Sequence, residues 1–170
     1  GSSVLSIGCG TTVLLSGLSA VVLYNGVYTY LKRKTAFASV PCAVIGMIPP
    51  FTGWLAAGGD FPDRRIIALC FLFYLWQVTH FWLLFLAYGE DYDKAGLPSL
   101  THLFTETQLR RIVFIWVLAT ATASVLLILY GVMKSFPVTI VLFASIIWLI
   151  LKFAGLIRST ERDMPYHFIF

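Results

Sequence analysis

The chain has 170 residues, of which 59% are hydrophobic and only 12% are charged. Soluble domains average about 25% charged residues, so this composition excludes a protein whose main solvent is water. The formal net charge is +4, but the basic residues lie in short loops between apolar runs. That distribution argues against nucleic-acid binding and for membrane topology.

Long charge-free runs indicate the fold class. Lys, Arg, Asp and Glu are absent from 1–31, 35–59, 66–89, 112–133 and 135–151. Apolar runs of about 18–20 residues cross a bilayer as helices, because lipid offers the backbone no hydrogen-bond partners. We therefore predict an all-α, polytopic transmembrane bundle that forms one membrane domain over 1–170. Its helices are expected at about 11–31, 38–58, 65–88, 109–132 and 136–157.

The first predicted helix ends in polar and aromatic residues. Asn25 and Tyr28 precede the three adjacent cations Lys32, Arg33 and Lys34. Tyrosine and basic residues are enriched where a helix meets lipid headgroups. The same residues also suit a grip for an anion, most naturally a diphosphate. The pattern alone leaves both interpretations open.

The second predicted helix contains Pro49-Pro50, with Gly46 and Gly53 on either side. Proline removes a backbone hydrogen bond, so this helix should kink or break, and a broken helix in a bundle often lines a pocket. The three cysteines, Cys9, Cys42 and Cys70, fall in apolar runs without metal-ligand spacing. We expect them to be small buried hydrophobic residues.

The third predicted helix carries Trp76, Gln77 and His80. Gln77 and His80 are one helical turn apart, so they share a face. An ionisable group inside a membrane is costly and usually faces a cavity or a partner. His80 is therefore either a hydrogen-bonded packing element or part of a polar pocket with Gln77, Asn25 and Tyr28.

An acidic cluster follows this helix. Glu90, Asp91 and Asp93 fall within four residues, next to Lys94. Oxygen ligands this close suit Mg²⁺ that bridges to substrate phosphates, although a solvated acidic turn would look the same. On one face of the membrane, an acidic and a basic cluster are the two halves of a metal and diphosphate site.

The basic residues also predict orientation. Five spans place eight of them on one side (Lys32, Arg33, Lys34, Lys94, Arg110, Arg111, Arg158, Arg162) and three on the other (Arg64, Arg65, Lys134). Basic loops stay on the side from which a protein inserts. The first side is therefore predicted to face the cytoplasm, or the equivalent matrix compartment.

Four motifs in order resemble a known family. They are Tyr28-Thr29 with Leu31-Lys32-Arg33 and Thr35, Gly46 with Ile48-Pro49-Pro50 and Gly53-Trp54, Trp76-Gln77 with His80-Phe81-Trp82, and Asp91-Tyr92 with Ala95-Gly96 and Pro98. Together they resemble the haem-farnesylating branch (protoheme IX farnesyltransferases, or haem O synthases) of the UbiA-type intramembrane prenyltransferases. Thr79, Ser99 and Cys42 stand where that branch usually has proline, methionine and glycine. Tyr88 and Tyr92 take the spacing at which many other UbiA-type relatives carry two aspartates.

The resemblance implies a fold and a reaction. The chain would correspond to about helices four to eight of a nine-helix bundle, a fragment expected to be inactive alone. The family transfers a farnesyl group from farnesyl diphosphate to a vinyl group of haem b, which gives haem O for terminal oxidases. Haem b is then a substrate, and Mg²⁺ is the expected cofactor. The expected setting is a bacterial or mitochondrial inner membrane, with haem A synthase or oxidase assembly proteins as partners.

The resemblance also assigns roles to residues. Lys32 and Arg33 would hold the diphosphate, beside Lys94, and Asp91 would bind metal with Asp93 or Glu90. Tyr28, Trp54 and Trp76 would shield the allylic cation with their ring faces, and His80, Gln77 and Asn25 would contact haem or the attacking water. His102 and His167 are expected to be structural or solvated.

Two other functions compete with this one. Prenylation of a quinone or chlorophyll precursor is a second enzyme reading, disfavoured by the His80-Phe81 and Asp91-Tyr92 pieces. A non-catalytic membrane bundle is the third. It predicts that the basic and acidic loops lie far apart.

Overall fold

Five helical segments of the computed structural model can cross a membrane. The structure describes residues 11–96, 98 and 100–158, and this part of the chain contains helices and no strands. The segments that are long and apolar enough are Thr11–Leu31, Ala36–Ala56, Arg64–Gly89, Glu106–Leu129 and Phe136–Gly155. The predicted all-α membrane bundle is confirmed.

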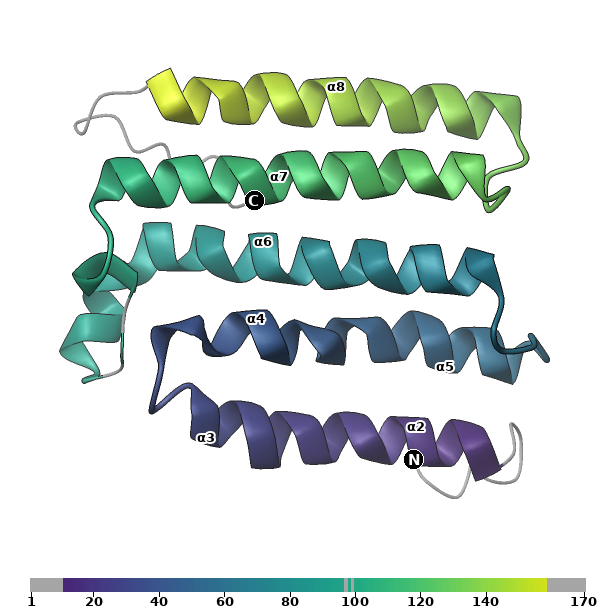
Figure 1. Cartoon of the computed structure of the whole chain (residues 1–170), viewed down its shortest axis with the longest axis horizontal. Coiled ribbons are helices and arrows are strands. Elements are labelled where there is room, and N and C mark those ends of the chain that lie inside the picture. The colour runs from purple at the N-terminus through teal and green to yellow at the C-terminus, as the bar shows by residue number, and fades with distance from the viewer. Residues whose placement is uncertain (1–10, 97, 99, 159–170) are drawn as a thin grey trace.

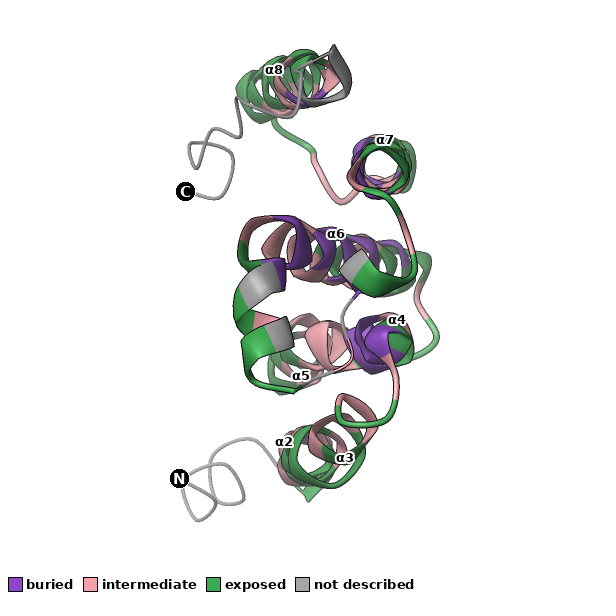
Figure 2. Ribbon diagram, turned by 90° about the vertical axis from the view of Figure 1, so that its left-hand side faces the viewer, coloured by how far each residue is buried: buried purple, intermediate pink, exposed green. Residues whose placement is uncertain are grey.

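The spans follow one another across the molecule in chain order, each antiparallel to the one before (Figure 1). α2 (Thr11–Val22) packs on α5 (Ile48–Ala56), α5 on α6 (Arg64–Lys94), α6 on α7 (Glu106–Leu129), and α7 on α8 (Phe136–Arg158). The view along the helices shows the same succession from α2 to α8 (Figure 2). As a result, the loop at 32–35 and the last turns of α6 lie at one end, which we call the Lys32 end. Loops 57–63 and 130–135 lie at the other, the Lys134 end.

The first span changes its helical type before it ends. α2 leads into a π-helical segment, Leu23–Tyr28, and then into α3 (Thr29–Leu31). Within it, Asn25 Nδ2 donates to the carbonyl of Val21 at 3.0 Å, and Thr29 Oγ1 donates to the carbonyl of Tyr24 at 3.0 Å. Short π segments are rare and often occur at functional sites. This segment carries Asn25 and Tyr28, the two residues that precede the basic cluster.

The second span is broken, as the prolines predicted. A 3-10 turn at Ala36–Ala38, α4 (Ser39–Cys42) and a 3-10 segment at Ala43–Met47 precede α5. The break precedes Pro49-Pro50, because a proline ring clashes with the carbonyl four residues earlier. At Gly46 the broken segment approaches α6 so closely that an added Cβ would lie 3.1 Å from the Cβ of Gln77.

α6 crosses the membrane and then changes direction. Its backbone leaves helical geometry at Tyr88 (φ −123°, ψ 20°), next to Gly89. Glycine neighbours are a common cause of helix kinks. The turns beyond Tyr88, which contain Asp91, therefore point away from the axis of the membrane-spanning part.

α6 and α7 form the core. Val78, Trp82, Val113 and Val117 are buried between them. The buried hydroxyls of Thr79 and Thr120 hydrogen-bond across this interface at 3.0 Å. α7 begins at Glu106, three residues before the expected start at 109, because Thr105 and Gln108 form a capping box.

Candidate functional site

The basic and acidic clusters share the Lys32 end of the bundle (Figure 1). Lys32 and Arg33 follow α3, and Asp91 lies in the last turns of α6. Among the residues that the structure describes, no hydrogen bond or ion pair joins these two cations to Asp91. Opposite charges from two separate segments thus stand at one end without neutralising each other directly.

Asp91 is open to solvent. Its side chain is 69% exposed, and its Oδ1 lies 3.7 Å from the ammonium of Lys94, which is itself 73% exposed. Exposed ion pairs contribute little, typically about 0–1 kcal/mol, so Lys94 does not lock Asp91 in place. The side chains of Glu90 and Asp93 lie outside the described residues.

Aromatic rings connect the basic loop to α6. The ring centroid of Tyr28 lies 5.7 Å from that of Phe81 and 5.4 Å from that of Tyr24. The ammonium of Lys32 lies 5.5 Å from the centroid of Tyr28. A cation at this distance is attracted to the ring face. Tyr28 therefore touches both the basic cluster and the membrane-spanning part of α6.

Gln77 and His80 face neighbouring regions rather than one shared pocket. Gln77 packs against Gly46 in the broken second span. His80 stacks on Trp76, with centroids 5.5 Å apart and planes 9° apart, and its ring centroid is 6.2 Å from that of Phe81. Asn25 is exposed and binds a carbonyl of its own helix. Ring contacts thus link Tyr28 to Phe81 and Phe81 to His80. Gln77 and Asn25 make their contacts elsewhere.

Trp54 lies near the Lys134 end, away from Tyr28. Its Nε1 donates to the carbonyl of Asp60 at 2.9 Å, and the guanidinium of Arg65 lies 5.2 Å from its ring. From Arg65 to Phe81, α6 rises about 24 Å. The structure therefore does not bring Trp54 beside Tyr28, because α5 runs toward the opposite end of the span. Trp54 holds the 57–63 loop instead.

The same loop contains a well-formed ion pair. The backbone N–H and the guanidinium of Arg65 donate to the carboxylate of Asp63 at 2.7 and 2.8 Å. These hydrogen bonds lower the pKa of Asp63 to about 2. Asp63 is therefore ionised at every physiological pH.

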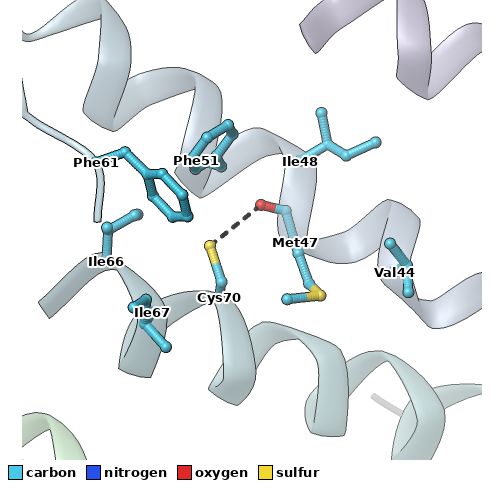
Figure 3. Close-up of a pocket in the computed structure, with 8 residues that line it drawn as sticks. All are labelled: Val44, Met47, Ile48, Phe51, Phe61, Ile66, Ile67 and Cys70. Atoms are coloured by element: carbon cyan, nitrogen blue, oxygen red, sulfur yellow. Dashed lines mark hydrogen bonds between the residues drawn. The ribbon is translucent and has the colours of Figure 1, made fainter. Parts of the chain in front are cut away.

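An apolar pocket lies beside the break in the second span. Its volume is about 350 Å³. Figure 3 shows its lining, which comes from both sides of the break and from the start of α6: Val44, Met47, Ile48, Phe51, Phe61, Ile66, Ile67 and Cys70. The thiol of Cys70 donates to the carbonyl of Met47 at 3.6 Å. Cys42 and Cys70 are buried, and Cys9 lies outside the described residues.

A larger hollow opens between α6 and α8. It consists of two adjoining cavities of about 490 and 400 Å³ that share Trp76, Thr120, Trp148 and Leu149. His80 and Lys152 line the second cavity. Sequence reasoning passed over Trp148 and Lys152. The available signal was a lysine one helical turn after a tryptophan in an otherwise apolar helix.

The remaining titratable residues form no protein-only metal centre in the part of the chain that is described. There, no three His, Cys, Asp or Glu side chains lie close enough to hold an ion together. His102 is exposed. His167 lies outside the described residues.

Comparison with known proteins identifies relatives. A model of the UbiA prenyltransferase family matches residues 1–170. The protoheme IX farnesyltransferase of Nitratidesulfovibrio vulgaris is 33% identical over 167 residues, which are 98% of this chain and 58% of that protein. The protoheme IX farnesyltransferase of Geobacter sulfurreducens is 42% identical over 135 residues, 75% of this chain and 50% of that protein.

A mitochondrial relative is also similar. The protoheme IX farnesyltransferase of Yarrowia lipolytica is 41% identical over 96 residues, 56% of this chain and 20% of that protein. No solved structure gives a significant match. The chain spans little more than half the length of the bacterial relatives. Since the family model covers the chain from end to end and the helices form the membrane bundle that it requires, this chain belongs to the UbiA prenyltransferase family.

Proposed function

We propose that this protein transfers a farnesyl group from farnesyl diphosphate to a vinyl group of haem b and so makes haem O. The observation that carries the proposal is the shared position of Lys32, Arg33 and Asp91 at one end of an apolar helical bundle. An ionising isoprenoid needs charged groups at its diphosphate and a water-poor surface along its chain. The names of the relatives supply the acceptor.

The reaction breaks the bond between C1 of the farnesyl group and the diphosphate oxygen, and the electron pair leaves with the diphosphate. The allylic cation then bonds to the terminal vinyl carbon of haem b. Water adds to the cation left on the macrocycle and loses a proton, which gives a hydroxyethylfarnesyl side chain. Two cationic species form in turn, so the site must stabilise positive charge away from bulk water.

Lys32 and Arg33 are assigned to the diphosphate. Arginine forms paired hydrogen bonds with phosphate oxygens, and a lysine ammonium adds a point charge. Both offset the negative charge that grows on the leaving group. Contact between Lys32 and the ring of Tyr28 places this charge beside an aromatic surface that can face the developing cation.

Asp91 is assigned to Mg²⁺, with Asp93 as a second ligand. One or two carboxylates plus substrate phosphates is the usual protein share of a magnesium site. The exposed carboxylate of Asp91 and its loose pairing with Lys94 fit that arrangement. When bound, the ion would offset the charge of the departing diphosphate. Lys94 would contact the same phosphates.

The acceptor side is assigned to α6. Tyr28 and Trp76 are assigned to the allylic cation, to which each ring face would contribute about 0.5–2 kcal/mol. His80, Gln77 and Asn25 are assigned to haem or to the attacking water. The excess of basic residues at the Lys32 end supports its placement in the cytoplasm or matrix, where haem A synthase or oxidase assembly proteins would receive the product.

Expression of the complete reading frame that encodes this chain, in cells that lack haem O synthase, tests the proposal. Haem O is measured by mass, together with prenylated quinone and chlorophyll precursors. We expect haem O in cells with the wild-type protein, and far less of it with Asp91→Ala or Arg33→Ala at equal membrane insertion. Normal haem O from both variants rejects these assignments, and a prenylated quinone precursor instead of haem O rejects the function.

A further inference from the structure

The hollow between α6 and α8 has two unlike ends. Its walls are Phe73 and Trp76 on α6 and Trp148 on α8, and Thr120 of α7 lies in its floor. His80 and Lys152 occur only in the cavity nearer the Lys32 end. Figure 2 shows α7 set to one side of α6 and α8. We call this hollow the α6–α8 groove.

The walls of the groove are flat and aromatic. His80 and Trp76 of α6 stack almost in parallel, with 5.5 Å between ring centroids. Trp148 faces the groove from α8, and the ammonium of Lys152 lies 4.9 Å from its ring centroid. Trp76 is 51% and Trp148 60% exposed. Such surfaces accept a flat, apolar body by stacking.

Headgroup anchoring does not explain Trp76. Tryptophan gathers at membrane interfaces, but Trp76 lies about 18 Å along α6 from Arg64, near the middle of its span. Lys152 is nearer the interface, about 4.5 Å before Gly155, where its span ends. Its assignment to the groove rests on its place in the cavity lining.

The hydroxyls in the floor are already satisfied by the protein. Ser124 Oγ and Ser145 Oγ donate to carbonyls four residues earlier. The hydroxyls of Thr79 and Thr120 lie 3.0 Å apart, and each is 2.9 Å from the carbonyl four residues before it. Because a hydroxyl has one proton, one threonine donates to the other and the second donates to its carbonyl. These hydroxyls therefore do not need hydrogen bonds from a ligand. The ammonium of Lys152 lines the cavity and favours a ligand that carries negative charge.

We propose that the α6–α8 groove binds a planar aromatic carboxylate, with the macrocycle between Trp76 and Trp148 and a carboxylate on Lys152. This inference rests on the proposed function and extends it, because haem b has this shape and carries two propionates. Its vinyl groups lie on the edge opposite the propionates. A propionate held by Lys152 directs the vinyl edge away from α8.

Phe81, the next residue after His80, packs against Tyr28 on the other side. On α6, His80 therefore lines the groove. Its neighbour Phe81 contacts Tyr28, whose ring lies under the ammonium of Lys32. The acceptor and the isoprenoid would occupy adjoining regions that meet at the turn of α6 that holds His80 and Phe81. Lys152 and Trp148 become positioning residues for the acceptor.

The test measures binding by the full-length protein in lipid nanodiscs, with haem b and its dimethyl ester as probes. Lys152→Gln should weaken binding of haem b about tenfold, the scale of one lost charge-assisted hydrogen bond, and leave the ester unchanged. Lys152→Arg should retain haem b. Trp148→Ala should weaken both probes. Lys134→Gln, in the loop before α8, is the matched control for charge and should bind both normally.

Several outcomes overturn the inference. Lys152 does not bind the carboxylate if wild type and Lys152→Gln have equal affinity for haem b, or if the variant loses equal affinity for haem b and the ester. Normal binding of both probes by Trp148→Ala would exclude the groove as the binding site. Farnesyl diphosphate binding is measured in parallel as a fold control. If every variant and the wild type bind farnesyl diphosphate but none binds haem b, the proposed function fails with the inference. If haem O forms normally and only the Lys152 effects are missing, the inference fails alone.

Discussion

Tyr28 packs against Phe81 with 5.7 Å between ring centroids, and the ammonium of Lys32 lies 5.5 Å from the same tyrosine ring. One side chain thus links the basic loop to the membrane-spanning part of α6. The contact also fixes the π-helical end of the first span against the third.

Replacement of Tyr28 tests whether its ring, rather than its hydroxyl, matters. Tyr28→Phe keeps the ring face and should retain haem O synthesis within about threefold. Tyr28→Ala loses the ring and should lower the rate about 10-fold or more, at the upper end of cation–π energies of about 2 kcal/mol. Initial rates with membranes that contain equal amounts of protein measure the effect. Equal rates for both variants would show that the ring does not serve the reaction.

Charge removal at the two ends of the bundle should have unequal effects. Arg33→Ala should raise the KM for farnesyl diphosphate, because a phosphate contact is lost, while Arg64→Ala at the Lys134 end should not. Asp91→Asn should raise the Mg²⁺ concentration needed for half-maximal rate. Titrations of both substrates and Mg²⁺ measure these shifts. A KM change in Arg64→Ala as large as that in Arg33→Ala would place the diphosphate elsewhere.

The Thr79–Thr120 hydrogen bond should hold α6 to α7. Thr79→Val should lower the free energy of unfolding by about 1 kcal/mol, the usual scale of a hydrogen bond between membrane helices. Thr122→Val serves as the control. It removes an exposed hydroxyl of α7 that donates to the carbonyl of Leu118 within its own helix. Unfolding in mixed micelles measures both. In a double-mutant cycle with Thr120→Val, simple additivity would mean that the pair does not interact.

Gly46 and Gly53 provide a matched pair on one broken span. A Cβ at Gly46 would lie 3.1 Å from the Cβ of Gln77, and one at Gly53 would meet nothing within 4 Å. Gly46→Ala should therefore destabilise the protein by roughly 1–3 kcal/mol through overpacking. Gly53→Ala should be neutral or stabilise it, because alanine favours the helix. Thermal denaturation in detergent compares them, and the reverse order would contradict the close approach at Gly46.

Titration of Asp63 should report its bonds to Arg65. The pKa of Asp63 is lowered to about 2, and in Arg65→Gln it should return toward about 3.9. Because the folded pKa is below the unfolded one, the contact stabilises the protein above about pH 4. That contribution is lost as pH falls through the folded value. Carboxyl NMR in micelles measures the shift, and an unchanged pKa in the variant would exclude Arg65 as its cause.

Several features could be read from the sequence because they depend on local chemistry. Charge-free runs marked the spans, and Pro49-Pro50 marked the broken one. The alternation of antiparallel helices was enough to bring the loop of Lys32 and the segment of Asp91 to one end. None of these predictions depends on which helices are in contact.

Other features depend on packing between distant segments, which one sequence does not contain. The π-helical geometry around Asn25 has no residue signature of its own. Trp54 belongs to a matching motif, yet the direction of α5 takes it away from Tyr28. Lys152 stands just after a charge-free run, and the sequence alone does not show which helix it faces. Its significance appears only when α8 lies opposite His80.

The break in helical geometry at Tyr88 has a mechanical consequence. The membrane-spanning part of α6 is clamped by Phe81 against the first span and by Thr79 against α7. The short arm beyond Tyr88 leaves the helix axis at that residue, and Tyr92 of the arm packs back against Phe85 of the span with 4.9 Å between ring centroids. Movement of the Asp91 carboxylate relative to the buried part of α6 would therefore require this one aromatic contact to break, and the helices in the lipid would not have to repack.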